Sequence, residues 1–248
     1  QALAAIGQCE LMFLYDKFFG EYGHTVAQVL LTADVVDFPR GRENVQNTFR
    51  ELLSMGVIPV VNENDTVSFT EFNFGDNDML GAIVAAMLNA DLYAILSDID
   101  GLYDRDPRRH ADAHLISVVE RVDDDLYTLA EDSSTGLGTG GAGSAVGTGG
   151  MASKVRAARA MIAAGVPMVV CRGREHDSFR RVVEGEGLGT RFEAPAGVQH
   201  ESARKLWIGL AEMSRGSVVL DAGASRAILE RNTCGVLALA GDGGYPYA

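Results

Sequence analysis

Two short polar segments in this 248-residue chain have the residue types that bind charged small molecules. Residues 62–65 (Asn-Glu-Asn-Asp) directly follow the apolar run 57–61, and residues 75–78 (Gly-Asp-Asn-Asp) directly precede the apolar run 79–88. Carboxylate and amide groups in such segments can hydrogen-bond the charged groups of a substrate, or hold Mg²⁺ directly or through water. The simpler alternatives are a solvated turn for the first segment and a helix cap for the second.

A third polar segment, residues 97–107, follows the apolar run 92–96. Ser97 and Asp98 stand where a nucleotide could lie against the end of a strand, and Gly101 permits close approach of the backbone. The alternative is a turn-rich loop that ends in an Asp-Pro pair.

The fourth segment is a glycine-rich run, residues 147–154 (Gly-Thr-Gly-Gly-Met-Ala-Ser-Lys). Small residues let successive N–H groups point at phosphate oxygens, and Lys154 adds a cation for the charge that develops in phosphoryl transfer. The run is not a Walker A motif, because G-x-x-x-x-G-K-[ST] is absent. A mobile linker over 133–150 is the alternative, but a linker does not predict the helical pattern that directly follows at 151–164.

Alternating apolar patterns predict the elements that position these segments. We expect helices at 2–19, 44–55, 79–88 and 151–164, a further helix starting within 123–129, and strands at 26–31, 57–61, 92–96 and 167–171. This alternation predicts an α/β fold, a three-layer sandwich around a mostly parallel sheet, in which ligands bind beyond the carboxyl ends of the strands. A second, mainly β piece is expected from about residue 203 to the end.

The composition excludes several classes of protein. Hydrophobic residues make up 47% and charged residues 22%, which favours a soluble globular protein over a disordered one. The net charge of −13 argues against nucleic-acid binding, and no apolar stretch approaches the roughly 20 residues that span a membrane. The three cysteines form no CxxC pair or metal-ligand cluster, so we interpret them as reduced thiols and expect a cytoplasmic protein without a bound structural metal.

The order of the four segments resembles the glutamate-phosphorylating members of the amino-acid kinase family. The likeness extends to residues 2–8, 30–32, 44–48, 101–103 with 106–107, Trp207 and 227–231. It implies an amino-acid kinase domain over 1–198 and part of a PUA-like domain over 203–248. It also implies that the family's first strand, which carries a phosphate-binding lysine, and a glycine-serine loop are missing from this chain.

The resemblance implies that ATP, with Mg²⁺, phosphorylates the γ-carboxylate of L-glutamate to L-glutamyl 5-phosphate, the first step of proline biosynthesis. Feedback inhibition by proline and a homo-oligomer are implied in the same way. Asp65 and Asn77 would contact glutamate, with Asn62 close by. Asp78 would organise the lysines and the metal around the phosphates, with support from Asp76.

The resemblance also assigns the nucleotide site. Ser97 and Asp98 would contact the nucleotide, and Lys154 would stabilise the transferring group. The ATP phosphates would be covered by a loop of seven residues: Thr148, Gly149, Gly150, Met151, Ala152, Ser153 and Lys154. A glycine-rich segment at 138–141 repeats the Gly-Thr-Gly-Gly sequence, but only the second copy is followed by Met-x-x-Lys, and the function is assigned there.

Two alternatives stay open at this point. One is another member of the same family, acting on carbamate, aspartate, N-acetylglutamate or a nucleoside monophosphate. The other is a catalytically silent chain that binds glutamate or proline, or a partner subunit, which the missing lysine would favour.

Overall fold

The computed structural model describes residues 1–33, 35, 38–67, 76–107, 109–135 and 150–193. The chain divides into two units, Gln1–Ala211 and Glu212–Ala248, and all described residues belong to the first. The β piece expected at 203–248, the glycines at 138–141 and most of the loop at 147–150 lie outside the described residues.

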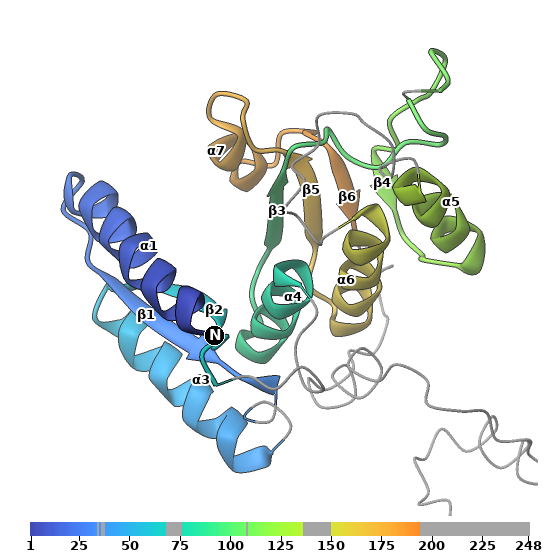
Figure 1. Ribbon diagram of the computed structural model, residues 1–248. Coiled ribbons are helices and arrows are strands. Elements are labelled where there is room, and N and C mark those ends of the chain that lie inside the picture. Colours follow the sequence, from blue (N-terminus) through green and yellow to red (C-terminus); the bar gives the residue numbers. More distant parts are fainter. Residues whose placement is uncertain (34, 36–37, 68–75, 108, 136–149, 194–248) are drawn as a thin grey trace, which may run out of the picture. The chain divides into compact units, whose positions relative to one another are not determined.

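The first half of the chain builds a pair of parallel strands flanked by two helices (Figure 1). Strand β1 (Val26–Leu31) pairs with β2 (Ile58–Glu63), in a register that runs from Val26 opposite Ile58 to Leu31 opposite Glu63. Helix α1 (Ala2–Gly20) contacts β1, and helix α3 (Pro39–Ser54) contacts β2. The parallel pairing places the carboxyl ends of both strands at one edge, so the polar segment after β2 lies at that edge.

The second half builds a four-stranded sheet in the order β3-β5-β6-β4. The strands are β3 (Tyr93–Ser97), β4 (Val118–Val119), β5 (Met168–Arg172) and β6 (Thr190–Phe192). The pairs β3–β5 and β4–β6 are parallel, and β5–β6 is antiparallel. The prediction of a mostly parallel sheet is therefore confirmed, although the described strands form two hydrogen-bonded sheets where we expected one.

Strand β5 shows why its run of apolar residues is continuous. Met168 and Val170 face the core formed with helices α4 (Asn77–Leu88) and α6 (Met151–Ala164), whereas Val169 and Cys171 face helix α7 (Ser178–Val183). Successive residues of a strand point to opposite faces, so a strand covered on both faces is apolar at every position. This arrangement gives the three layers that the alternation predicted.

Helix α6 packs closely because its buried face is built from small residues. Ala157, Ala158 and Ala160 are almost completely buried, and the helix contacts α4, β5, β6 and α5 (Asp124–Thr135). Gly165 ends the helix in a left-handed conformation, as expected for a glycine at that position. The predicted bounds of α6 and of β1 agree with the structure.

Other boundaries differ from the predictions for identifiable reasons. Helix α3 begins five residues earlier than expected, with Pro39 in its first turn, where the missing N–H costs nothing. Strand β2 continues through Asn62 and Glu63, two residues beyond the predicted strand at 57–61. Helix α5 continues to Thr135, inside the predicted linker. The short elements β4, α7 and β6 were not predicted.

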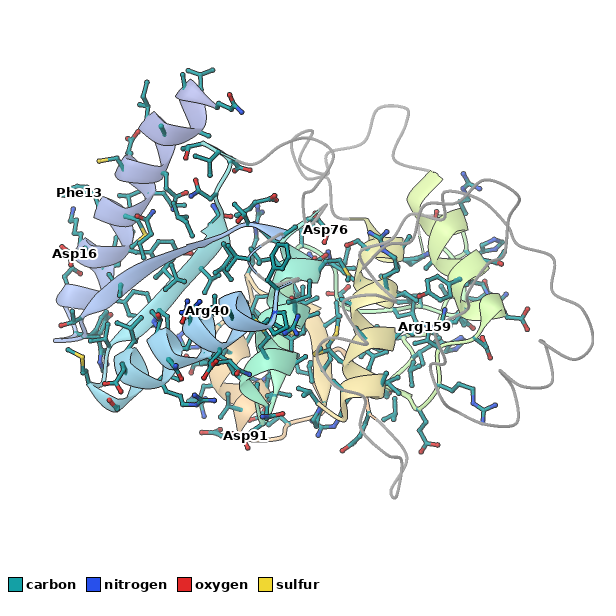
Figure 2. The ribbon with its side chains drawn as sticks, turned by 90° about the horizontal axis from the view of Figure 1, so that it is seen from below. Phe13, Asp16, Arg40, Asp76, Asp91 and Arg159 are labelled. Carbon is teal, nitrogen blue, oxygen red and sulfur yellow. The ribbon has the colours of Figure 1, made fainter. Side chains whose placement is uncertain are left out.

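Helix α1 ends one residue later than the predicted range 2–19, and most of its apolar side chains are exposed. Leu3 and Ile6, which define its apolar spacing, are 84% and 68% exposed in the chain, and Phe13 points away from the strands (Figure 2). The half-buried positions of the helix are Ala4, Gln8, Met12 and Phe19. No helix among the described residues is long and apolar enough to cross a membrane.

Candidate active site

Asp76 links the first turns of two helices. As the N-cap of α4 it accepts a hydrogen bond from the backbone N–H of Met79 at 2.9 Å, so the capping role considered above is real. Its other oxygen, Oδ2, accepts a hydrogen bond from Ser153 of α6 and lies 3.6 Å from the guanidinium of Arg156. A cap alone requires none of these contacts with α6.

Asp78 and Lys154 form a buried ion pair beside Asp76. The Lys154 Nζ and Asp78 Oδ2 atoms are 2.9 Å apart, and the two side chains are only 8% and 16% exposed. Ser153 Oγ lies 3.4 Å from the same carboxylate oxygen. Burying an ion pair costs desolvation energy that hydrophobic packing avoids, so such a pair is weak evidence for stability and points to a functional use.

The pair lies where the N-termini of α4 and α6 come together. Asp76 and Asp78 occupy the N-cap and first turn of α4, and Ser153 and Lys154 occupy the first turn of α6, whose N-cap is Gly150. The N-terminus of a helix carries unsatisfied N–H groups and a partial positive charge. Two such ends together with a lysine favour an anionic ligand such as a phosphate group.

Tyr93 of β3 contacts the first turn of α4 at this site. Its hydroxyl donates a hydrogen bond to the backbone carbonyl of Asp78 at 2.9 Å. Gly81, one turn along α4, leaves room for the ring, because a Cβ there would lie 2.8 Å from the Tyr93 Cζ atom. Burial raises the pKa of Tyr93 above its ordinary value, and the carboxylates of Asp78 and Asp76 raise it further, so the phenol stays protonated.

The residues predicted for the nucleotide lie at the carboxyl ends of β3 and β5. Ser97 is the register partner of Arg172, its carbonyl accepts the N–H of Gly173 at 2.8 Å, and its hydroxyl bonds the exposed Asp98 at 3.2 Å. This is the edge of a parallel pair at which ligands of α/β proteins bind.

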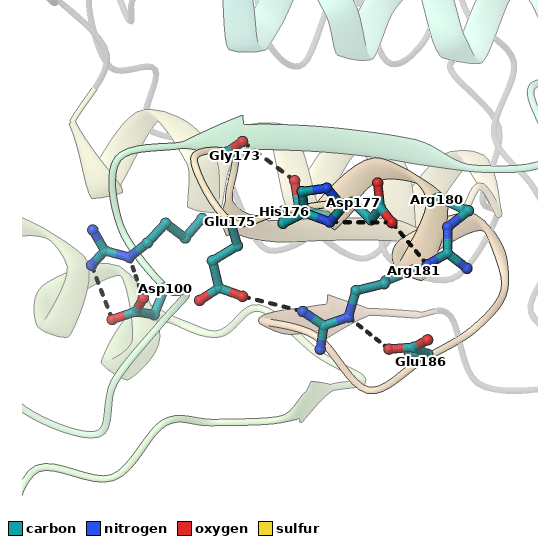
Figure 3. Close-up of polar contacts among 10 residues, drawn as sticks. Asp100, Gly173, Glu175, His176, Asp177, Arg180, Arg181 and Glu186 are labelled. Carbon is teal, nitrogen blue, oxygen red and sulfur yellow. Dashed lines mark hydrogen bonds and ion pairs between the residues drawn. The ribbon is translucent and has the colours of Figure 1, made fainter.

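An ion pair at the same edge was not predicted. The Arg172 guanidinium donates two hydrogen bonds to Asp100, one of them at 3.1 Å, and Figure 3 shows both. Tyr103 donates to the same carboxylate at 3.1 Å. The hydrogen bond from Arg172 is the main cause that lowers the pKa of Asp100, and the bond from Tyr103 adds to it, against the opposing effect of burial.

The residues predicted for glutamate lie partly in a second group, at the end of β2. Asn62 donates from Nδ2 to Gln8 Oε1 at 3.1 Å, while its Oδ1 accepts the N–H of Glu63 at 2.9 Å. Asp65 is exposed in the turn that follows β2. Asn77 is exposed in the first turn of α4.

The structure thus brings together four of the predicted residues, Asp76, Asp78, Ser153 and Lys154, across more than 70 residues of sequence. Met151 and Ala152 are half-buried in the first turn of α6, whereas Thr148 and Gly149 lie outside the described residues. Sequence reasoning missed Gln8, Tyr93, Asp100, Arg156 and Arg172. A tyrosine or arginine at the end of a buried strand is a signal that could have suggested Tyr93 and Arg172, but nothing local marks Gln8.

Metal binding is limited to what two aspartates can supply. Among the described residues, no group of three or more His, Cys, Asp or Glu side chains is placed to hold a metal ion. Mg²⁺ needs no such group when it arrives with a nucleotide, since one or two carboxylates and the phosphate oxygens are its usual ligands. The carboxylates of Asp76 and Asp78 therefore fit a nucleotide-bound Mg²⁺ and do not form a separate metal centre.

Converging helix ends, a buried lysine–aspartate pair and polar residues at a strand edge lie together on an α/β sandwich, and their chemistry fits a phosphate group. A family model, the amino acid kinase family, matches residues 1–172. Glutamate 5-kinase of Deinococcus radiodurans is 49% identical over 235 residues, which are 94% of this chain and 61% of the relative. Glutamate 5-kinase of Caldanaerobacter subterraneus is 44% identical over 233 residues, 93% of this chain and 59% of the relative.

The chain belongs to the amino acid kinase family. It spans about three-fifths of the length of these curated relatives. Among solved structures, the isopentenyl phosphate kinase product complex of T. acidophilum has a TM-score of 0.43 at 16% identity and covers 75% of this chain and 66% of its own. UMP kinase of Bacillus anthracis has a TM-score of 0.43 at 16% identity, over 70% and 59% of the two chains.

Proposed function

We propose that the chain phosphorylates the γ-carboxylate of L-glutamate with ATP and releases L-glutamyl 5-phosphate and ADP. The observation that carries this proposal is the buried Asp78–Lys154 pair at the joined N-termini of α4 and α6. The relatives above, which carry the name glutamate 5-kinase, support glutamate as the substrate. This reaction would place the chain at the first step of proline biosynthesis, in the cytoplasm.

The reaction requires positioning and charge neutralisation, not a general base. A γ-carboxylate has a pKa of about 4.3, so it is already an anionic nucleophile at neutral pH. It attacks the γ-phosphorus in line, the bond from that phosphorus to the bridging oxygen breaks, and ADP leaves. Lys154 and the helix N-termini are placed to stabilise the negative charge that develops on the oxygens of the transferring phosphoryl group.

Asp78 keeps Lys154 in place for this role. Without a carboxylate partner a buried ammonium group is poorly solvated, and it either loses its proton or moves toward solvent. The 2.9 Å contact with Asp78 fixes the position of the Nζ atom at the N-terminus of α6. Asp76 fixes Ser153 in the same turn, which restricts the backbone before Lys154.

The remaining groups are assigned by their position at strand ends. We assign glutamate to the residues after β2 and at the start of α4, namely Asn62, Asp65 and Asn77. We assign the nucleotide to Ser97, Asp98 and the loop from Thr148 to Lys154. Mg²⁺ bound to ATP would supply further charge neutralisation, with Asp78 and Asp76 as its protein ligands. We further propose that proline inhibits the chain at a pocket that overlaps the glutamate site, and that the chain assembles into a homo-oligomer.

A coupled assay of ADP release tests the proposal, with glutamate, aspartate and carbamate as separate acceptors. The expected result is release with glutamate only, together with an acyl phosphate that hydroxylamine converts to a hydroxamate. Equal release in the absence of glutamate, or preference for another acceptor, would contradict it. Glutamate binding without ADP release would support the catalytically silent alternative.

A further inference from the structure

We infer that Gln8 is a substrate-binding residue whose side-chain amide donates a hydrogen bond to a carboxylate of the amino-acid substrate at the end of β2. The inference rests on the proposed function, because the carboxylate is taken to be one of those of glutamate. It adds to the site a residue from α1. This helix contains none of the four polar segments and neither residue of the buried ion pair.

The position of Gln8 on α1 is unusual for a polar residue. The helix meets the strands through Ala4, Gln8, Met12 and Phe19, which are its half-buried positions. Spacings of four, four and seven residues place these side chains on one face of a helix. Gln8 is the polar member of this face, while apolar side chains such as Leu3 and Ile6 are exposed.

The orientation of the Gln8 amide follows from its partners. Asn62 Oδ1 accepts the backbone N–H of Glu63 at 2.9 Å, so the other end of the Asn62 amide must be its NH₂ group, a donor. That donor lies 3.1 Å from Gln8, which must therefore present its oxygen Oε1 as the acceptor. The reverse orientation would place two NH₂ groups against each other.

This orientation leaves the NH₂ group of Gln8 buried without an acceptor among the described residues. It is the one buried side-chain nitrogen or oxygen atom in that part of the chain for which this is so. Buried donors are nearly always satisfied, because an unmade hydrogen bond costs the full desolvation of the group. The Gln8 NH₂ group lies beside Asn62, at the carboxyl end of β2, and ligands of α/β folds bind at such strand ends. A carboxylate oxygen is an acceptor that fits this donor.

Two substitutions separate the roles of the two halves of the amide. Gln8→Glu keeps an oxygen for Asn62 and replaces the free donor by a second carboxylate oxygen. Gln8→Met keeps the length of the side chain and removes both polar atoms. The matched control is Gln46→Met, since Gln46 is also half-buried but its amide donates to the backbone carbonyl of Met87 at 2.8 Å, near the other end of α4 from Asp76.

The measurement is glutamate affinity by calorimetry, together with the KM for glutamate, the KM for ATP and the melting temperature of each variant. We expect Gln8→Glu and Gln8→Met to weaken glutamate binding by about ten- to a hundredfold, which is what one hydrogen bond to a charged group is worth. The KM for ATP should change less than about twofold in both, and Gln46→Met should lower the melting temperature without changing either KM.

The outcomes distinguish this inference from the proposed function. If the wild type binds glutamate and Gln8→Glu binds it with the same affinity, the inference alone is overturned. That result would show that a water molecule or the protein satisfies the Gln8 amide. Equal increases in the KM for glutamate and for ATP would also overturn it, because they indicate a structural role. Failure of the wild type to bind glutamate would overturn both.

Discussion

Replacing Gly81 by alanine tests whether the contact between α4 and Tyr93 holds the site. The added Cβ would lie 2.8 Å from Tyr93 Cζ and 2.9 Å from Cε2, whereas carbon atoms in contact stay about 3.5 to 4.0 Å apart. The ring must therefore retreat by roughly 0.7 Å. The hydrogen bond from the Tyr93 hydroxyl to the carbonyl of Asp78, 2.9 Å long, would then exceed hydrogen-bonding distance.

The expected loss of stability combines three effects. Overpacking costs about 1 to 3 kcal/mol and the lost hydrogen bond about 0.5 to 1.5 kcal/mol, while the higher helix propensity of alanine returns about 1 kcal/mol. Gly81→Ala should therefore lower the free energy of unfolding by about 0.5 to 3.5 kcal/mol. It should also lower the kcat of the proposed reaction, because Asp78 shifts.

Urea denaturation measures this change, and Gly7→Ala is the matched control. Gly7 also lies inside a helix, but a Cβ there would have no neighbour within 4 Å, so this substitution should stabilise α1 or leave stability unchanged. The destabilisation by Gly81→Ala should be smaller when it is measured in a Tyr93→Leu background. If Gly81→Ala were as stable as the wild type, the ring would have room that the structure denies it, and the reasoning would be refuted.

The remaining predictions concern titration and the second sheet. The folded-state pKa of Tyr93 lies above 10, so the unfolded chain loses its proton first and stability should fall as the pH rises above about 10; Tyr93→Phe should reduce that slope in denaturation curves. The pKa of Asp100 lies below 3.8, so it stabilises the fold above that pH and the effect is lost as the pH falls through the folded-state pKa; Arg172→Gln should return the carboxyl titration, followed by NMR, toward 3.8. Gly189→Ala should cost roughly 2 to 6 kcal/mol, because its φ is +73° and the Cβ would lie 2.7 Å from that of Cys171, whereas Gly187→Ala, with no neighbour within 4 Å, should be nearly neutral.

The sequence patterns predicted the elements whose signals are local. The run 167–171 indicated a buried strand, and the alanine-rich pattern of 151–164 indicated a helix that ends at Gly165; both are confirmed, with the strand at Met168–Arg172. Strands β4 and β6 have two and three residues, too few for a period to be read, and their pairing comes from the tertiary structure.

The site was predictable in part. Polar residues after strands and before helices pointed to the right segments, but the pairing of Asp78 with Lys154 joins residues that no local pattern relates. On α1, the period shows which residues share a face but not which face meets the strands. Leu3 and Ile6 follow the apolar spacing of this helix, yet they are exposed, and the structure places Gln8 on the half-buried face.

The kcat of Lys154→Met tests the central claim most directly, with Arg159→Met as the control. Arg159 lies on the same helix, but its exposed guanidinium stacks over Tyr127, 5.8 Å from the ring centre, away from Asp78. Lys154→Met leaves the buried Asp78 carboxylate without its partner, which destabilises the fold. The folded fraction of each variant is therefore measured by circular dichroism at the assay temperature.

If Lys154 stabilises the transferring phosphoryl group, folded Lys154→Met should lose about a hundred- to a thousandfold in kcat for glutamate-dependent ADP release, while Arg159→Met keeps the wild-type value. A folded Lys154→Met protein with wild-type kcat would contradict the assignment of the buried pair to phosphoryl transfer.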